Sequence, residues 1–481
     1  MEVGKISNKI DSDTTDLLYR LDSLKYRPYS RTVITLVAFS FFLVFWDVYN
    51  IGFILPMAAK QLNVPISSFL YALPISTGLA GYVVGEIGIG YYSQIIGRRN
   101  SLLLTLTIAA VGSLLAAISM NFLEMAIFRF IIGIAIGAEI AITSTYVSEI
   151  TPSSMRGTYV GIATAVGMIE ILPVGATAYF IVPTISWGWR LMFGIGALVA
   201  IPLIIMRFIY LPESPRWLLK VGRKEDAENV ISKMEDYVKK THGNIDRIPI
   251  KKIPEKLVET KINIRTFFTH KKISQRLLLL LLAWFFYYIG DYALVSVVPS
   301  LFVSHGLTIS TSILYFFLSS SGDSVGSFTG MAISDKFERK YISFGIMALS
   351  MVFFIIWGIV SSPALLILAG FLVFFTQGLW LPVMYSYSAE LFPTEERAIG
   401  VGLTDGLGHI GGVIAPYIII PIAISAGIFG ISGYLWAFIV MGITALIAGL
   451  IVGVAGPKTN KLRLEQINEE EEISEVDKNG R

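Results

Sequence analysis

Apolar residues gather in twelve runs, each about 20 residues long, which is the length a helix needs to cross a bilayer. Short polar segments separate the runs within each half of the chain, and a longer lysine-rich segment separates the halves. The pattern predicts helices over roughly 33–56, 67–93, 101–120, 123–148, 158–182, 191–210, 276–303, 309–333, 341–361, 364–389, 398–424 and 430–455. We therefore expect an all-α polytopic membrane protein with twelve transmembrane helices in two six-helix bundles.

Polar segments and basic residues predict the domain limits and the orientation. We expect an N-terminal tail over 1–32, a first bundle over 33–210, a linker over 211–274, a second bundle over 275–455 and an acidic tail over 456–481. Lys and Arg are abundant in the N-terminal tail and in the loops after the even-numbered helices, whereas the loops after helices 3, 7, 9 and 11 hold none. Because loops rich in Lys and Arg stay on the cytoplasmic side, both termini are predicted to be cytoplasmic, in a protein of the plasma membrane.

The composition agrees with a membrane protein and excludes several kinds of functional site. Hydrophobic residues make up 54% of the 481 positions and charged residues only 15%, against about 25% in soluble domains. Cysteine is absent, which excludes disulfides, thiol catalysis and cysteine-based metal sites. Residues 1–31 are polar, so we expect no cleavable signal peptide. No enzyme motif is found, and we expect no cofactor, no metal and no nucleic-acid partner.

The two halves share charged turns at one fixed spacing. The offset is the same for glutamate (390 − 149 = 241), for proline (393 − 152 = 241) and for arginine (397 − 156 = 241). The basic turns after helices 2 and 8 repeat it, since 339 − 98 = 241 and 340 − 99 = 241. Five matches at one offset indicate internal duplication. In transporters built from such repeats, the solute site lies near the bilayer midplane between the halves.

These turns belong to a set of motifs that resembles the sugar-porter-like branch of the major facilitator superfamily. Residues 90–99 (GYYSQIIGRR) resemble its signature after helix 2, although Gln94 stands where an Asp is usual. The spacing Arg129-x3-Gly133-x3-Gly137 resembles its helix-4 motif, and residues 211–218 (LPESPRWL) resemble its signature after helix 6. The resemblance covers almost the whole chain and implies alternating access of two bundles.

The resemblance also implies that charged turns at the cytoplasmic ends act as a gate. Charge-assisted pairs of Glu149 or Glu390 with nearby arginines would latch the outward-open state and break as the inner side opens. The predicted gating residues are Arg98, Arg99, Glu149, Arg156, Asp335, Arg339, Glu390 and Arg397.

A candidate solute site combines polar residues of helix 1 with aromatic residues of helices 7 and 10. Asp47 and Asn50 are three positions apart and share a helix face. Asp291 lies among tyrosines, whose rings stack on flat or cationic groups and whose hydroxyls orient a solute. The predicted substrate-binding residues are Asp47, Asn50, Trp284, Tyr287, Tyr288, Asp291 and Trp380.

The predicted helices hold many acids and few bases. The acids are Asp47, Glu86, Glu139, Glu170, Asp291, Asp323 and Asp405. Arg129 is counted as the only central base and His409 as the only imidazole, so side chains cannot pair all the acids. Some are expected to carry a proton at neutral pH, which favours proton symport of a cationic, zwitterionic or neutral polar solute. The predicted proton-coupling residues are Asp47, Glu139, Asp291 and Asp405, with Glu139 alternatively a partner of Arg129.

Other functions remain open at this stage. A facilitative or proton-coupled sugar transporter fits the resemblance, but helix 7 lacks the amides that suit hydroxyl-rich solutes, and Thr164 stands where sugar porters carry a glutamine. A phosphate or organic-anion symporter is disfavoured because no central lysine is available. A non-transporting sensor would need a longer cytoplasmic extension. The expected partners are a small-molecule solute, protons and the lipid bilayer, and we expect a monomer.

Overall fold

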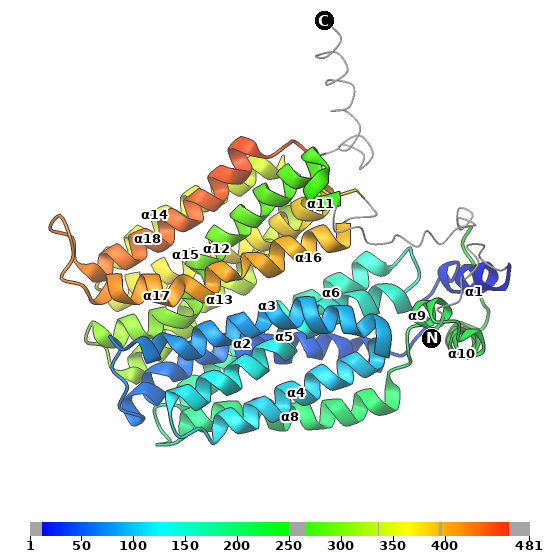
Figure 1. Ribbon diagram of the computed structural model, residues 1–481, viewed down its shortest axis with the longest axis horizontal. Helices are drawn as coiled ribbons and strands as arrows, with labels where there is room; N and C mark the ends of the chain where they lie inside the picture. The colour runs from blue at the N-terminus through cyan, green and yellow to red at the C-terminus, as the bar shows by residue number, and fades with distance from the viewer. Residues whose placement is uncertain (1–11, 250–265, 335, 394–396, 461–481) are drawn as a thin grey trace, which may run out of the picture.

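The computed structural model describes residues 12–249, 266–334, 336–393 and 397–460, and these ranges are almost entirely helical. The first bundle consists of α2 (Arg31–Gln61), α3 (Phe69–Ile96), α4 (Arg98–Ala117), α5 (Phe122–Ile150), α6 (Arg156–Met168), α7 (Ile171–Ile181) and α8 (Gly188–Tyr210). The second consists of α12 (Lys271–Ser304), α13 (Ile309–Ile333), α14 (Arg339–Ile359), α15 (Pro363–Glu390), α16 (Arg397–Gly408), α17 (Ile410–Ile424), α18 (Gly433–Leu450) and the π-helical turn Ile451–Ala455. Figure 1 shows the bundles stacked with their helices running in the same general direction.

In the ranges that the structure describes, helices occupy all twelve predicted spans, but two of the spans are interrupted. Ten segments are long and apolar enough to cross a membrane, and the remaining two are α13, whose serines lower its hydropathy, and the α6–α7 pair. The predicted helix 158–182 breaks between α6 and α7, and the helix 398–424 breaks at His409 between α16 and α17. Glycines flank the second break at Gly408 and Gly411, and glycine lowers helix stability. The prediction of one continuous helix over 158–182 was wrong. The span 398–424 still acts as one helix, because hydrogen bonds from His409 to Asp405 and from Val413 to His409 continue through the interruption.

Within each bundle, glycines bring one equivalent pair of helices into backbone contact. A Cβ atom built on Gly133 of α5 would lie 1.9 Å from the carbonyl oxygen of Gly78 on α3. In the second bundle, a Cβ atom on Gly322 of α13 would lie 2.1 Å from the carbonyl oxygen of Phe371 on α15. Only glycine permits such an approach. Gly322 is the counterpart of Gly81 on α3 (322 − 81 = 241), whose Cβ atom would lie 2.2 Å from the carbonyl oxygen of Phe130 on α5, so the duplicated half reproduces the packing of this helix pair.

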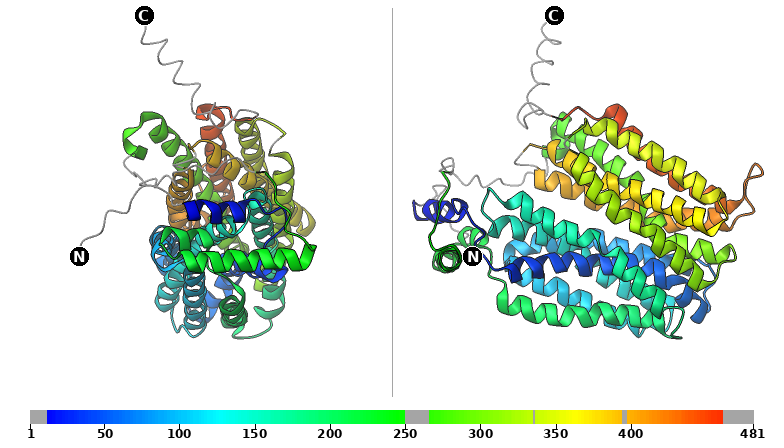
Figure 2. Two further views of the ribbon diagram at one scale, coloured as in Figure 1. Left: turned by 90° about the vertical axis from the view of Figure 1, so that its right-hand side faces the viewer. Right: turned by 180° about the vertical axis from the view of Figure 1, so that it is seen from behind.

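The tightest contacts between the bundles lie in the half of the molecule far from the chain termini. A Cβ atom on Gly52 of α2 would lie 2.0 Å from the carbonyl oxygen of Val295 on α12. Tyr71 and Ser300 share a 2.5 Å hydrogen bond between α3 and α12. We call this half the far end, and the opposite half, where both bundles approach the termini, the terminal end (Figure 2).

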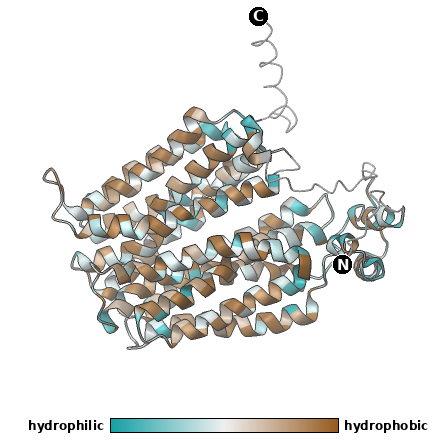
Figure 3. Cartoon of the chain, in the orientation of Figure 1, coloured by the Kyte–Doolittle hydropathy of each residue, from teal (hydrophilic) through white to brown (hydrophobic). Residues whose placement is uncertain are grey.

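Three amphipathic helices cover the terminal end of the first bundle: α1 (Ser12–Asp22), α9 (Pro215–Lys220) and α10 (Lys224–His242). They carry more hydrophilic residues than the bundle helices (Figure 3). The N-terminal tail is thus partly ordered, which the sequence did not predict, because α1 is held by its charges. Asp22 binds Arg156 at 3.0 Å and Arg216 at 2.7 Å, and Arg20 binds Glu235 at 2.7 Å. The acidic tail beyond residue 460 lies outside the described residues.

Acid is expected to release α1 from α10. Burial raises the pKa of Glu235, but hydrogen bonds from Arg20 and Arg247 outweigh it and hold this pKa below its ordinary value. Because the folded pKa is depressed, the stabilisation is complete above the unfolded value of about 4.3 and is lost as the pH falls through the folded pKa. Hydrogen exchange over residues 12–22 is expected to accelerate in that acid range, after correction for the intrinsic rate.

The matched variants are Glu235→Gln and Glu228→Gln. The first is expected to lose protection of α1 already at neutral pH and to show little further change in acid. The second should behave like the wild type, because the Glu228 side chain is 60% exposed and lies 3.5 Å from Arg20. Equal protection of α1 in the wild type and Glu235→Gln would contradict the prediction.

Candidate functional site

A pocket lies between the bundles, bounded by α2, α3 and α5 on one side and α12 on the other. It takes in about 330 Å³ of space free of atoms, part of it open to solvent. Its polar lining comes from Tyr82 and Arg129 of the first bundle and Tyr292 and Ser296 of the second, and the remaining wall is mostly aliphatic. One cation, hydroxyls and an apolar wall are the kinds of group that line sites for small polar solutes.

Arg129 reaches across the first bundle to Asp47. Its Nη1 donates to the carbonyl oxygen of Asp47 at 3.0 Å and lies 3.7 Å from the carboxylate Oδ1. Both residues are 5% exposed, and Ser113 donates to the other carboxylate oxygen at 3.3 Å. The prediction that Arg129 faces protein rather than lipid is consistent with this position. A buried ion pair beside an interbundle pocket is suited to respond when a proton or a solute arrives.

Several buried polar atoms around this pair lack a hydrogen-bond partner among the described residues. They are Asp47 Oδ1, Arg129 Nε, both side-chain polar atoms of Asn50 and both carboxylate oxygens of Glu170. Asn50 and Glu170 are completely buried. Buried polar atoms normally have partners, so these atoms represent unused binding capacity for water, protons or solute. The sequence singled out Asp47 and Asn50 as solute-binding residues, and that role stays a prediction.

A second group of acids lies where α2 meets α12 and α13. Tyr49 of the first bundle donates to Asp323 of the second at 3.3 Å, and Tyr287 donates to Asp291 at 3.3 Å. The Tyr49–Asp323 hydrogen bond therefore joins the bundles. Asp323 appeared in the sequence only among the intramembrane acids, because its partner lies 274 residues away.

The aromatic residues proposed as a solute clamp pack inside the second bundle. Trp284, Tyr287 and Trp380 are at most 1% exposed, and the Tyr287 and Trp380 rings stack at 4.3 Å. The indole of Trp284 donates to Ser388 at 3.2 Å, and that of Trp380 donates to Ser343 at 2.6 Å. The polar atoms of both tryptophans are engaged within their own bundle, and their contact with a solute stays a prediction.

Glu139 is held in the interior of the first bundle. Its carboxylate binds Arg207 of α8 at 2.5 Å, and both residues are at most 3% exposed. Thr105 and Thr143 donate to the same carboxylate. The alternative pairing of Glu139 with Arg129 was wrong, and so was the count of one central base, because Arg207 had been placed at the end of helix 6. The pair lies within one bundle, while a proton-coupling role for Glu139 remains untested.

The predicted gating residues form matching pairs within each bundle. Arg98 binds Glu149 at 3.0 Å, and Arg339 binds Glu390 at 3.1 Å, at the same 241-residue offset. Arg156 binds Asp22 of α1 instead of Glu149.

The remaining gating residues have other positions. Arg99 donates its backbone N–H to Glu213 at 3.1 Å and a guanidinium N–H to the carbonyl oxygen of Phe208. Arg397 begins α16, and Asp335 lies outside the described residues. The latch function of the whole set stays a prediction.

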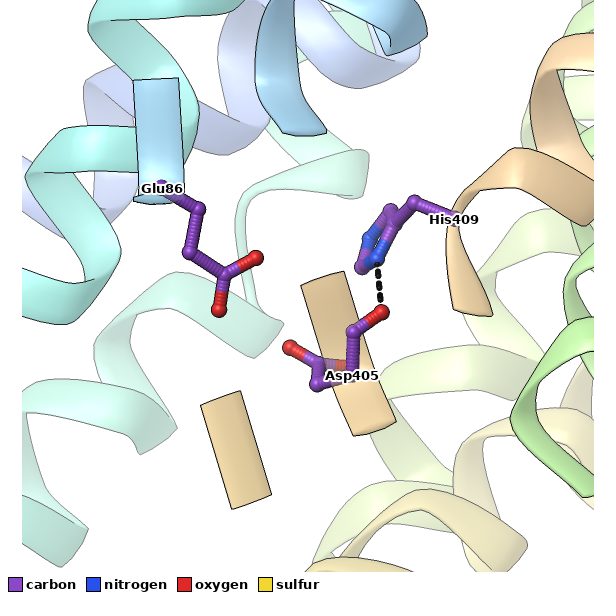
Figure 4. Close-up of side chains that lie close together, drawn as sticks. All are labelled: Glu86, Asp405 and His409. Carbon is purple, nitrogen blue, oxygen red and sulfur yellow. Dashed lines mark hydrogen bonds between the residues drawn. The ribbon is translucent and has the colours of Figure 1, made fainter. Parts of the chain in front are cut away.

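Asp405 and His409 meet Glu86 where α16 and α17 approach α3 (Figure 4). One carboxylate oxygen of each acid and one ring nitrogen of His409 lie within 4.8 Å of one another. Tyr288 and Tyr385 donate to Oδ1 of Asp405, and the His409 ring lies between Tyr82 and Tyr288 at centroid distances of 4.1 and 3.9 Å. Tyr288 is thus the member of the proposed aromatic clamp that reaches the interface.

Comparison with known proteins agrees with this architecture. The family model for "Sugar (and other) transporter" matches residues 33–470. YyaJ of Bacillus subtilis, assigned as a metabolite transport protein, is 30% identical over 442 residues, which are 92% of this chain and 95% of that protein. The niacin transporter NiaP of Acinetobacter baylyi is 24% identical over 469 residues, covering 94% and 99%.

Among solved structures, the xylose transporter XylE of Escherichia coli in an inward open conformation has the same fold. Its TM-score is 0.69 at 19% identity, with 91% of this chain and 98% of that chain covered. The predicted fold class is therefore confirmed. The chain has the fold of XylE, a major facilitator superfamily symporter, and it belongs to the sugar (and other) transporter family, whose members are membrane transporters and not enzymes.

Proposed function

We propose that this protein moves a small polar organic solute across the plasma membrane by alternating access, driven by proton symport. The observation that carries the proposal is the Asp47–Arg129 pair beside the interbundle pocket, near buried polar atoms that have no hydrogen-bond partner in the part of the chain that the structure describes. A proton on Asp47 would release Arg129 from its ion pair and change what the pocket can bind. Protonation and solute binding would thereby be coupled.

The basic loops and the closest contacts between the bundles support an orientation in the membrane and a conformational state of the transporter. The basic loops lie at the terminal end, which we assign to the cytoplasm together with both termini. The far end is then extracellular, and it is closed by Gly52 against Val295 and by the Tyr71–Ser300 hydrogen bond. In this assignment the molecule faces inward, and the solute leaves through the terminal end. The Arg98–Glu149 and Arg339–Glu390 pairs are nevertheless intact, and each lies within one bundle, so this state does not require them to break as the latch hypothesis expects.

The direct test is uptake by purified protein in proteoliposomes. The labelled panel contains pentoses, hexoses, amino acids, niacin and other aromatic acids, organic amines and phosphate, each with an inward proton gradient and with the gradient collapsed. Accumulation of one class above the external concentration only with the gradient supports the proposal. Equal uptake under both conditions would reject proton coupling and favour a facilitative transporter, for which a sugar is the first candidate because the family model is that of sugar transporters.

Valine in place of Gly52 is expected to open the far end. The added Cβ would lie 2.0 Å from the carbonyl oxygen of Val295, a backbone atom of the other bundle that cannot move aside alone. Since the chain has no cysteine, spin labels can be attached at Ser67→Cys and Ser361→Cys, two exposed positions at this end. The interspin distance is expected to increase in Gly52→Val.

Gly194→Val is the matched control, because nothing lies within 4 Å of a Cβ atom at that position. It should leave the distance distribution of the wild type unchanged. An unchanged distribution in folded Gly52→Val would show that the far end does not depend on this contact.

A further inference from the structure

The side chains of Glu86, Asp405 and His409 bring together ligand types that bind transition metals. Imidazole and carboxylate are the usual donors to Zn²⁺ in sites without cysteine. The three donor atoms lie within 4.8 Å of one another, so a small rearrangement brings all three onto one ion. Asp405 and His409 are 5% and 2% exposed, which separates this group from an acidic patch on a surface.

The hydrogen bonds of His409 leave one ring nitrogen ready to bind. Nδ1 lies 2.7 Å from the carbonyl oxygen of Asp405, an acceptor only, so Nδ1 carries the proton. Nε2 then presents a lone pair, and it has no hydrogen-bond partner among the described residues. A histidine that donates one N–H to a backbone carbonyl and offers the other nitrogen is typical of metal ligands. Stacking between Tyr82 and Tyr288 fixes the ring in this position.

The carboxylates of Glu86 and Asp405 are also positioned to bind a cation. Oδ1 of Asp405 accepts hydrogen bonds from Tyr288 and Tyr385, which orient the group. Oε2 of Glu86 is buried without a partner among the described residues. It lies against Gly406, where a Cβ atom would come within 2.6 Å of it, so glycine lets this carboxylate reach the group. Two ionised carboxylates this close repel each other unless one takes up a proton or a cation lies between them.

The ligands come from both bundles. Glu86 belongs to α3 of the first bundle, while Asp405 lies on α16 of the second and His409 between α16 and α17 (Figure 4). An ion bound to all three would tie the bundles together in the arrangement seen here. Alternating access requires these bundles to move relative to each other, so the bound ion would arrest that motion.

We propose that Glu86, Asp405 and His409 form a binding site for a transition-metal dication such as Zn²⁺, which joins the two bundles and stops alternating access. The site shares no residue with the Asp47–Arg129 pair, although His409 stacks on Tyr82, which lines the interbundle pocket. The site does not depend on which solute is carried. The sequence did not predict it, because Glu86 is far from Asp405 along the chain and no ligand spacing connects them.

The first test is calorimetric titration of the full-length, tag-free protein in nanodiscs with Zn²⁺, with Mg²⁺ as the comparison ion. One Zn²⁺ per chain is expected, with much weaker binding of Mg²⁺, which prefers oxygen ligands. Glu86→Gln and His409→Gln are each expected to weaken Zn²⁺ binding by about 10-fold or more, since even loss of an outer hydrogen-bond partner weakens metal sites by about 10–100-fold. His305→Gln is the matched control. His305 stacks on Tyr434 at the far end, away from the three ligands, so this variant should bind Zn²⁺ like the wild type.

Gly406→Ala keeps all three ligands but adds a methyl group against Glu86, so it should also weaken Zn²⁺ binding even if a ligand variant fails to fold. The second readout is the interspin distance across the terminal end, between Ser154→Cys and Lys336→Cys. Zn²⁺ is expected to narrow this distribution in the wild type and to leave it unchanged in Glu86→Gln. Absence of Zn²⁺ binding to the wild type, or equal binding by the wild type and both ligand variants, would overturn the proposal.

Discussion

Asparagine in place of Asp47 is expected to abolish proton-driven accumulation, so that the solute only equilibrates across the membrane. Asparagine has nearly the same shape and can still accept the hydrogen bond from Ser113, but it carries no titratable proton and no charge for Arg129. The guanidinium would then remain free of its ion pair in every state, and solute binding would no longer depend on a proton. Uptake with and without an inward proton gradient measures the effect.

Solute exchange should persist in Asp47→Asn, because exchange needs the solute to bind and the bundles to move but needs no net proton transfer. Asp226→Asn is the matched control, since Asp226 pairs with Arg223 on the exposed surface of α10. Accumulation at the wild-type level in Asp47→Asn would move the proton site to one of the other predicted residues, Glu139, Asp291 or Asp405, and would reject the role proposed for this pair.

Methionine in place of Arg207 is expected to be the most destabilising of these changes. Arg207 is completely buried, binds Glu139 at 2.5 Å and donates to the carbonyl oxygen of Leu102 at 2.6 Å. Removing one member of a buried ion pair leaves the other charge without compensation, at a cost of about 3–5 kcal/mol. The midpoint of thermal unfolding, followed by tryptophan fluorescence in detergent, is expected to fall accordingly.

The double variant Glu139→Gln/Arg207→Met tests whether the unpaired Glu139 carboxylate causes the loss of stability. It removes both charges, so it should recover part of the stability lost in Arg207→Met. Arg223→Met, which breaks an exposed pair on α10, should leave the midpoint nearly unchanged. If the double variant is no more stable than Arg207→Met, the loss comes from packing of the arginine stem and not from the unpaired carboxylate.

Local patterns in the sequence accounted for much of the architecture. Runs of apolar residues predicted the twelve spans, because each span must be apolar over its own length regardless of its neighbours. The 241-residue offset predicted equivalent positions in the halves, and the Arg98–Glu149 and Arg339–Glu390 pairs occupy such positions. The break in the fifth span was missed, because hydropathy is the same in a straight and a broken helix.

The sequence identified residues of the candidate site but not the contacts between them. Asp47 and Arg129 were singled out as charges inside apolar helices, but their mutual contact depends on how α2 and α5 face each other. Arg207 was overlooked because its position near a helix end is typical of an arginine that reaches the membrane surface. The aromatic residues of helix 7 were correctly recognised as a cluster, but a one-dimensional pattern does not say whether a ring faces a solute or Trp380.

The sequence by itself therefore determined that this protein is a duplicated, twelve-helix membrane protein with acids inside its bundles. Only the tertiary structure decided which charges are partners, which end of the bundle pair is closed, and that Glu86 meets Asp405 and His409. The physical reason is that hydrophobicity acts along each helix, whereas a buried charge is satisfied by whichever group the packing brings near it. Those groups lie on other helices, and their approach depends on helix rotation and on contacts such as Gly52 against Val295.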